Sequence, residues 1–160
     1  LARFNLNADY LSPLAKEVTN MFGLEKGCAN TYMNNVCQLI ETVHVVERSI
    51  ELIDEVLAAG IKFERPDVKP QAGNGAGCVE APRGILFHRY IFDDKGICTG
   101  ANICIPTGQN HANIQKDFEV LVPQIIDEPQ EEIVRKMEML VRAYDPCISC
   151  STHYLDVEFV

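Results

Sequence analysis

The longest regular alternation of apolar and polar positions runs from about residue 32 to residue 59. Acidic residues occupy much of one side of this stretch, and Gly60 is suited to end a helix after it. The apolar residues recur at spacings of three and four, which places them on one face of an α-helix: Leu39, Val43, Val46, Ile50, Ile53 and Leu57. The pattern predicts one long amphipathic helix.

Shorter helices are predicted on both sides of it. Ser12-Pro13 is typical of a helix start, with proline at the first helical position and a helix continuing to about Met21. Another helix is expected over about residues 114–122, ending near Pro123. A last one begins at Pro129 with an acidic first turn, and its apolar face carries Ile133, Met137, Leu140 and Val141.

The middle of the chain has a different pattern. Residues 65–70 contain two prolines and predict an extended linker, and the glycines of residues 73–77 predict a flexible loop. Residues 85–92 and 97–105 are rich in branched and aromatic side chains and flank a turn at 93–96, which predicts a β-hairpin. Residues Pro106 to Asn110 are expected to follow the hairpin as a polar loop.

The expected fold class is therefore mainly α with a small β-hairpin or antiparallel sheet insert (α+β). The organisation predicted is a single segment over 1–160: 1–60 helical, 61–83 linker and Gly-rich loop, 84–105 β-hairpin, 106–153 helices ending in a metal-binding motif, and 154–160 a C-terminal tail.

Composition narrows the classes of protein. A chain of 160 residues, 47% hydrophobic and 23% charged, is long enough for an ordinary globular core. The net charge of -9 disfavours binding to nucleic acid or an anionic membrane surface, and no apolar run approaches the roughly 20 residues of a membrane span. Seven cysteines without a secretory signal indicate reduced thiols in a cytoplasmic protein. Because the chain begins at Leu1, it is expected to be a processed product, a split gene product or a piece of a longer polypeptide.

The densest group of metal-capable side chains lies near the end of the chain, where Asp145 and Pro146 precede Cys147, Cys150 and His153. A C-x-x-C pair can bind one metal or carry out thiol–disulfide chemistry, and the spacing alone leaves both open. The chain has no second such pair, so a closed four-thiolate site needs ligands from elsewhere.

Two upstream stretches could add to this site. Glu80-Ala81-Pro82-Arg83-Gly84 holds a guanidinium between proline and glycine, and Pro106-Thr107-Gly108-Gln109-Asn110 offers a hydroxyl and amides. Each alone is more often an ordinary turn.

Taken in order, these three motifs are specific. From about Cys28 to His153 the chain resembles the C-terminal part of the large (catalytic) subunit of nickel–iron hydrogenases, and it looks closest to their soluble cytoplasmic multi-subunit branch. The resemblance implies a large-subunit-like fold and a Ni–Fe centre whose iron carries carbon monoxide and cyanide. It also implies reversible heterolytic cleavage of dihydrogen into a proton and a hydride.

The resemblance assigns roles by motif match. Cys147 matches the terminal nickel ligand and first proton acceptor, and Cys150 matches a thiolate that bridges nickel and iron. Arg83 matches the guanidinium over the open side of the metals, and Asp145 matches the acid that supports it. The remaining matches form the wall of the site and the loop that receives a cyanide: Ala81, Pro82, Pro106 and Thr107.

A second ion is implied as well. His153 and the backbone carbonyl of Ile103 match ligands of a magnesium (or iron) ion near the centre. For His88, a packing or hydrogen-bonding role is at least as plausible as a role in the site.

The resemblance also implies partners. The family's first cysteine pair and its N-terminal glutamate have no counterpart here, so a missing N-terminal part of the large subunit is expected as a partner. Further electron-transfer subunits and an iron–sulfur small subunit are expected to set the acceptor, such as NAD(P), a deazaflavin or a disulfide reductase. Residues 154–160 extend beyond the histidine at which family precursors are usually cut, which indicates an unprocessed form or a branch that keeps a short tail.

The alternative from another class is a non-catalytic module in which Cys147, Cys150 and His153 hold zinc with a fourth ligand. A related alternative is a hydrogenase-like structural subunit of a redox complex. Arg83 with Pro106 and Thr107 favours the dihydrogen site, because a structural zinc site has no use for them.

Overall fold

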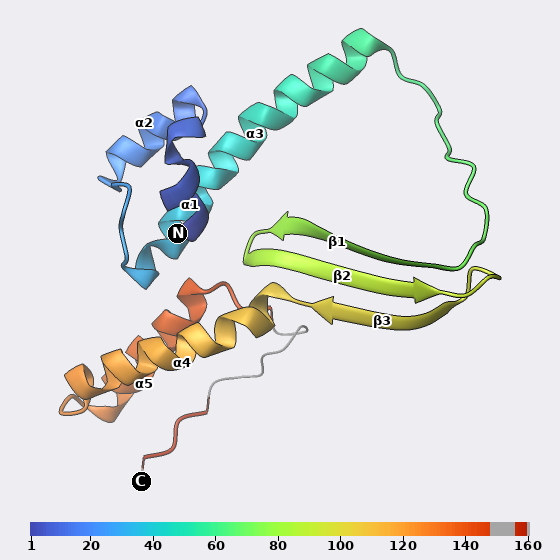
Figure 1. The fold of residues 1–160 in the computed structure, drawn as a ribbon. Helices are drawn as coiled ribbons and strands as arrows, with labels where there is room; N and C mark the ends of the chain where they lie inside the picture. Colours follow the sequence, from blue (N-terminus) through green and yellow to red (C-terminus); the bar gives the residue numbers. More distant parts are fainter. Residues whose placement is uncertain (148–155, 160) are drawn as a thin grey trace. The chain divides into compact units, whose positions relative to one another are not determined.

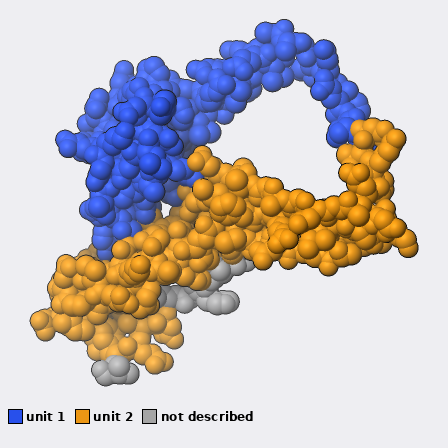
Figure 2. Space-filling view, in the orientation of Figure 1, with its two compact units in different colours: residues 1–66 blue, residues 67–160 orange. Residues whose placement is uncertain are grey.

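In this computed structural model the described residues are 1–147 and 156–159. The chain forms two compact units, residues 1–66 and 67–160, which are coloured separately in Figure 2. The elements follow one another as α1 (Ala2–Asn7), η1 (Ala8–Tyr10), α2 (Pro13–Met21), η2 (Thr31–Met33), α3 (Asn34–Ala59), β1 (Gly73–Ala81), β2 (Gly84–Phe92), β3 (Cys98–Cys104), α4 (Pro106–Ile125) and α5 (Gln130–Ala143) (Figure 1). Helices with one small antiparallel sheet confirm the predicted α+β class.

The core of the first unit lies where α1 and α2 pack on the N-terminal half of α3. Its buried residues are Phe4, Leu11, Ala15, Leu24, Cys37 and Ile40. Burial also raises the pKa of the Cys37 thiol, because the thiolate would lose its hydration there. Two polar contacts fix the same helices: Arg3 pairs with Glu41 at 2.8 Å, and the backbone N–H of Ser12 donates to His44 Nδ1 at 3.1 Å.

The long helix has the predicted extent, but of its predicted apolar face only Val43 packs against this core. Gly60 ends α3 with a φ of 81°, a conformation that glycine adopts without strain. Cys37 and Ile40, which are fully buried, lie on the same side of the helix as Glu51 and Glu55. Leu39, on the predicted apolar face, is 49% exposed. Periodicity therefore located an apolar face correctly but did not show which neighbour it meets.

The sheet has three strands in the order β1-β2-β3, all antiparallel, so the predicted hairpin β2–β3 gains a further strand. The prediction of a flexible loop over residues 73–77 was wrong, because these residues form the start of β1. Glycines alternate along this strand, and each lies opposite a ring of β2: Gly73 opposite Phe92, Gly75 opposite Tyr90 and Gly77 opposite His88. Nine paired residues and the neighbouring rings outweigh the low strand propensity of glycine.

The second unit continues with α4 and α5. The predicted loop at 106–110 is in fact the first turn and a half of α4, because Pro106 takes the first helical position, where its missing N–H costs nothing. Pro123 does not end this helix; it lies two residues before the end and affects only the last turn. The prediction for α5 is confirmed at its start, beside Pro129.

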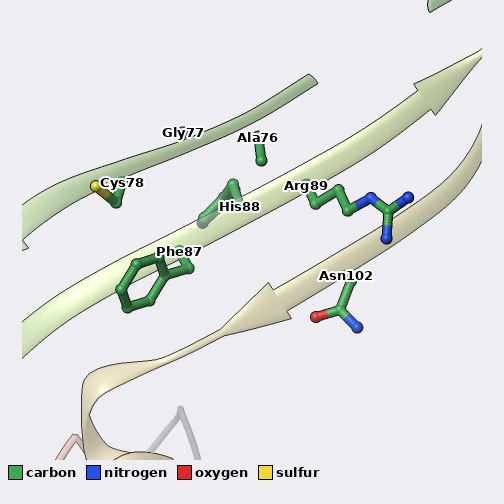
Figure 3. Close-up of a pocket in the computed structure, with 7 residues that line it drawn as sticks. All are labelled: Ala76, Gly77, Cys78, Phe87, His88, Arg89 and Asn102. Carbon is green, nitrogen blue, oxygen red and sulfur yellow. The ribbon is translucent and has the colours of Figure 1, made fainter. Parts of the chain in front are cut away.

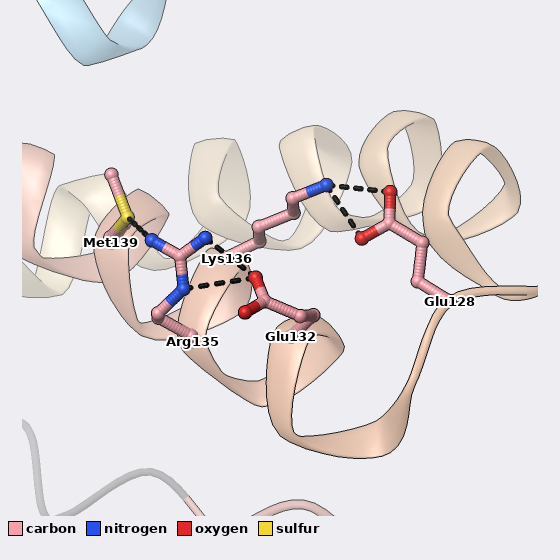
Figure 4. A network of polar contacts seen from close by, with 5 residues as sticks. All are labelled: Glu128, Glu132, Arg135, Lys136 and Met139. Carbon is pink, nitrogen blue, oxygen red and sulfur yellow. Dashed lines mark hydrogen bonds and ion pairs between the residues drawn. The ribbon is translucent and has the colours of Figure 1, made fainter.

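The buried contacts between α4 and α5 and at their ends involve Ile114, Ile125, Ile133, Leu140 and Ala143. Ion pairs lie at the start of α5 (Figure 4). Lys136 contacts both carboxylate oxygens of Glu128 at 2.6 Å, which joins α5 to the segment before it. Arg135 binds Glu132 at 2.6 Å one turn along the helix. Within the described ranges, no helix combines the length and apolar character needed to cross a bilayer.

We expect Ile40→Ala to lower the free energy of unfolding by about 3 kcal/mol, because it removes a fully buried side chain and leaves a cavity. Urea titration followed by circular dichroism measures this change. Ile50→Ala is the matched control on the same helix: its side chain is 57% exposed, so we expect a loss below about 1 kcal/mol. Equal losses in both variants would contradict the assignment of the core.

Candidate metal centre

The sequence motifs meet where three segments of the second unit converge. These are the turn between β1 and β2, the N-terminal turn of α4, and the C-terminal end of α5. Hydrogen bonds between the three segments join residues far apart in sequence, up to 62 positions.

The turn between β1 and β2 positions Arg83. Ala81 and Gly84 form the last pair of the ladder, so only Pro82 and Arg83 span the turn. Gly84 has a φ of 145°, and a Cβ placed there would lie 3.3 Å from Cβ of Pro106. The turn can therefore lie against the start of α4 because residue 84 has no side chain.

Arg83 holds the end of α5 by two hydrogen bonds. Its Nε donates to the backbone carbonyl of Asp145, and its Nη2 donates to Asp145 Oδ1 at 3.1 Å. Asp145 has a φ of 48° and follows the end of the helix in the left-handed region, which asparagine and aspartate adopt more readily than other residues with a side chain. This conformation costs on the order of 1 kcal/mol, and the two bonds from Arg83 offset it.

Thr107 connects α4 to the cysteine. Its side chain is only 2% exposed, and its Oγ1 accepts the backbone N–H of Cys147 at 3.3 Å. A hydroxyl that accepts a hydrogen bond keeps its own proton for donation. Thr107 can therefore hold the backbone of Cys147 and still donate to a ligand in the site.

Further residues support this arrangement, and sequence reasoning did not assign them a role. Asn110 Nδ2 donates to the carbonyl of Arg83 at 3.0 Å, and Gln109 Nε2 donates to the carbonyl of Ile85 at 2.8 Å. The hydroxyl of Tyr144 donates to Asp117 Oδ2 at 2.6 Å, which fastens the end of α5 to α4. The side-chain amides of Gln109 and Asn110 belong to the Pro106–Asn110 motif, so the sequence could have indicated them. No sequence signal indicates the contact between Tyr144 and Asp117.

The other predicted site residues are placed as follows. Ile103 lies in β3 opposite His88 and is 50% exposed. His88 Nδ1 lies 2.6 Å from the hydroxyl of Tyr90, so this histidine has a hydrogen-bonding contact within the sheet. Cys150 and His153, the predicted bridging ligand and second-ion ligand, lie outside the described residues.

Cys147 is the one described cysteine in a disulfide, and five others are free thiols. This differs from the expectation of reduced thiols throughout, and Cys147 must be reduced before its sulfur can bind a metal. Across the described ranges, no cluster of three or more His, Cys, Asp or Glu side chains is arranged to hold a metal. When reduced, Cys147, whose backbone binds Thr107, would supply a soft thiolate that fits a redox metal, and a complete site needs more ligands.

A separate hollow of about 450 Å³ lies on the sheet (Figure 3). Side chains from all three strands line it, among them Cys78, Phe87, Arg89 and Asn102. None of the predicted metal-site residues lines it, and its lining offers an exposed mixed surface rather than a ligand set.

Comparison with known proteins identifies the family of the chain. The chain belongs to the nickel-dependent hydrogenase family, whose model matches residues 13–153. It is 38% identical over 145 residues to a chain of the F420-non-reducing hydrogenase of Methanothermobacter marburgensis, a match that covers 88% of this chain and 29% of that protein. It is also 38% identical over 154 residues to the alpha chain of sulfhydrogenase 1 of Pyrococcus furiosus, covering 96% of this chain and 36% of that protein.

A solved structure shares the fold. The structure described as "Crystal structure of NAD+-reducing [NiFe]-hydrogenase in the H2-reduced state" matches with a TM-score of 0.73 and 28% identity, over 89% of this chain and 32% of that one. The chain thus spans about a third of the length of the relatives it matches.

Thr107→Val should lower the free energy of unfolding by about 1–3 kcal/mol, because it leaves the Cys147 N–H without its acceptor at a buried position. Thr107→Ser keeps the hydroxyl and should lower the free energy of unfolding by less. Denaturant unfolding measures both variants, and amide exchange at Cys147 should quicken in the valine variant alone. Equal exchange in the two variants would exclude this hydrogen bond as the link.

Proposed function

We propose that this chain is the C-terminal part of the catalytic large subunit of a nickel–iron hydrogenase, which cleaves or forms dihydrogen reversibly. The observation that carries the proposal is the cluster in which Arg83 binds Asp145 and Thr107 binds the backbone of Cys147. Family membership over residues 13–153 supports it.

In this proposal the Ni–Fe centre is held by Cys147 and Cys150 and by further thiolates from outside this chain. His153 and the carbonyl of Ile103 hold a magnesium (or iron) ion beside it. When bound, the centre, with carbon monoxide and cyanide on its iron, supplies Lewis-acid and redox chemistry toward dihydrogen. Ala81, Pro82, Pro106 and Thr107 form the wall around the iron ligands, and the Thr107 hydroxyl donates to a cyanide.

The chain's own residues then have separate tasks. The thiolate of Cys147 accepts a proton, as a general base placed next to the bond that breaks. Arg83 supplies a fixed positive charge that favours the separation of proton and hydride. Two of its five N–H donors bind Asp145, which leaves three for a ligand in the site.

The electrons leave through other proteins. We infer that the first acceptor is an iron–sulfur small subunit, with further electron-transfer subunits beyond it. The names of the matched relatives differ in what they say of the acceptor: one, from Cupriavidus necator, is NAD-reducing, and others are described as not reducing F420. The terminal acceptor is therefore a property of the partners, and a cytoplasmic location, proposed from the composition, suits such carriers.

Cys147→Ser should abolish dihydrogen turnover and remove most of the nickel, because a hydroxyl is a poor replacement for a soft thiolate ligand. The measurement is elemental analysis of the isolated assembly, with infrared spectroscopy for metal-bound carbon monoxide and cyanide. Cys98→Ser, at an exposed thiol of β3, is the control and should leave both unchanged. Zinc in place of nickel, without those infrared bands, would favour the structural-module alternative.

Arg83→Lys should retain nickel but lower turnover roughly tenfold or more, because an ammonium cannot bind both acceptors of Asp145 and still face the site. Arg89→Lys, on the exposed side of β2, is the matched control. Assays of turnover per bound nickel separate loss of chemistry from loss of metal. Turnover equal to that of the unmodified chain would remove Arg83 from the mechanism.

A further inference from the structure

Three polar side chains at the start of α4 each bind a different segment of the second unit. Thr107 accepts the backbone N–H of Cys147 at 3.3 Å, and Gln109 donates to one carbonyl in each of β2 and β3, at 2.8 and 3.3 Å. Asn110 donates to the backbone carbonyl of Arg83 at 3.0 Å. Both the cysteine and the arginine of the candidate site are therefore attached to the same end of one helix.

Thr107 and Asn110 are three residues apart, so they lie on the same side of α4. One turn of one helix thus sets the separation between the backbone of Cys147 and the backbone of Arg83. In the proposed function Thr107 also donates to a ligand of the site, whereas Asn110 has no role of its own. The question is what the hydrogen bond from Asn110 contributes.

The peptide bond between Arg83 and Gly84 is the part of the turn that most needs such a bond. Gly84 has a φ of 145°, and a Cβ placed there would lie 3.3 Å from Cβ of Pro106. The glycine lets the turn approach α4, but it also leaves the preceding peptide group free to rotate, because no side chain restricts φ at residue 84. The hydrogen bond from Asn110 to the carbonyl of that peptide removes this freedom.

Arg83 is thereby held at both ends. Its guanidinium donates to the backbone carbonyl and to Oδ1 of Asp145, and its own carbonyl accepts from Asn110. The side chains of Arg83 and Asp145 are 32% and 35% exposed, so water competes for the bonds at the guanidinium end. A fixed backbone leaves fewer conformations from which this ion pair must form, and so lowers the entropy cost of forming it.

We propose that Asn110 is a positioning residue for Arg83: it fixes the carbonyl of Arg83 and with it the direction in which the guanidinium extends from the β1–β2 turn. This inference rests on the proposed function, in which that guanidinium favours the separation of proton and hydride. Asn110 acts on the reaction through Arg83. Its loss should therefore lower the rate of turnover and not the amount of nickel bound.

Cleavage by trypsin reports on this attachment without requiring a metal. To cut after Arg83, trypsin must take up the arginine side chain and attack the same carbonyl that Asn110 binds. Mass spectrometry of the protein in its native assembly compares this cut with the cut after Lys62, in the exposed linker. Asn110→Ala should raise the ratio of the two rates roughly fivefold, the factor that corresponds to the loss of one ordinary hydrogen bond.

Two further variants make this measurement specific. Asn110→Asp keeps the shape of the side chain but replaces the N–H donor by an acceptor at neutral pH, so it should raise the ratio at least as much as alanine does. Asn113→Ala removes the same type of residue one turn further along α4, at an exposed position, and should leave the ratio unchanged. Urea unfolding of each variant shows whether the effect is confined to the turn.

Turnover tests the connection to the reaction. Asn110→Ala in the assembled protein should retain nickel and lower kcat about threefold or more, with KM for dihydrogen changed by less than about twofold. The double variant Asn110→Ala with Arg83→Lys should be no slower than Arg83→Lys alone, because Asn110 acts only through Arg83. Two effects that multiply would indicate a general structural role and overturn the positioning role.

The outcomes separate this inference from the proposed function. Equal cleavage after Arg83 in Asn110→Ala and in the unmodified protein, or no cleavage in either, overturns the positioning role. Increased cleavage with unchanged turnover per nickel also overturns it, while the proposed function stands. Increased cleavage in an assembly that contains no nickel and does not turn over dihydrogen supports the hold of Asn110 on Arg83 and contradicts the proposed function.

Discussion

The arrangement of the second unit depends on two hydrogen bonds that Arg83 donates to Asp145. One guanidinium binds both the backbone carbonyl and the carboxylate of a residue 62 positions away, and so joins the β1–β2 turn to the end of α5. A planar group with donors in fixed directions suits this task, because its two bonds define an orientation as well as a distance. Thr107 and Asn110 then fix the start of α4 to the same two segments. A metal site formed by these segments therefore has its ligands held in a defined geometry.

The order of assembly follows from these links. No single segment contains more than a fraction of the cluster, since the hydrogen bond between Thr107 and Cys147 spans 40 positions. The sheet and the α4–α5 pair must therefore form before Cys147 is correctly placed. A metal that binds only the finished arrangement would stabilise the folded chain by mass action.

Much of the fold was predictable where local signals were strong. The limits of α2 and α3, the strands of the β2–β3 hairpin and the start of α5 carry proline, glycine or periodic apolar positions that leave few alternatives. The strand β1 was missed because glycine favours no element by itself, and only pairing with β2 makes it extended. The N-terminal turn of α4 was missed because Pro106 is equally suited to a loop and to a first helical position.

The candidate site was predictable in its residue types but not in its connections. The order of the three motifs pointed to Arg83, Thr107, Asp145 and Cys147, and the structure brings them together. The hydrogen bond from Asn110 to the carbonyl of Arg83 could be identified only from the structure, because the two residues are 27 positions apart. The contacts of Cys150 and His153 lie outside the described residues, so their roles as ligands stay predictions.

The glycine-rich strand β1 has a consequence for how the chain behaves in the cell. It is an outer strand of the sheet, and no described strand pairs with its free side. Over Gly73–Ala81 it has one charged residue, Glu80, and no proline, so it lacks most of the features by which exposed strands resist pairing with other chains. The folded chain is therefore exposed to edge-to-edge aggregation along β1 wherever no other segment covers this strand.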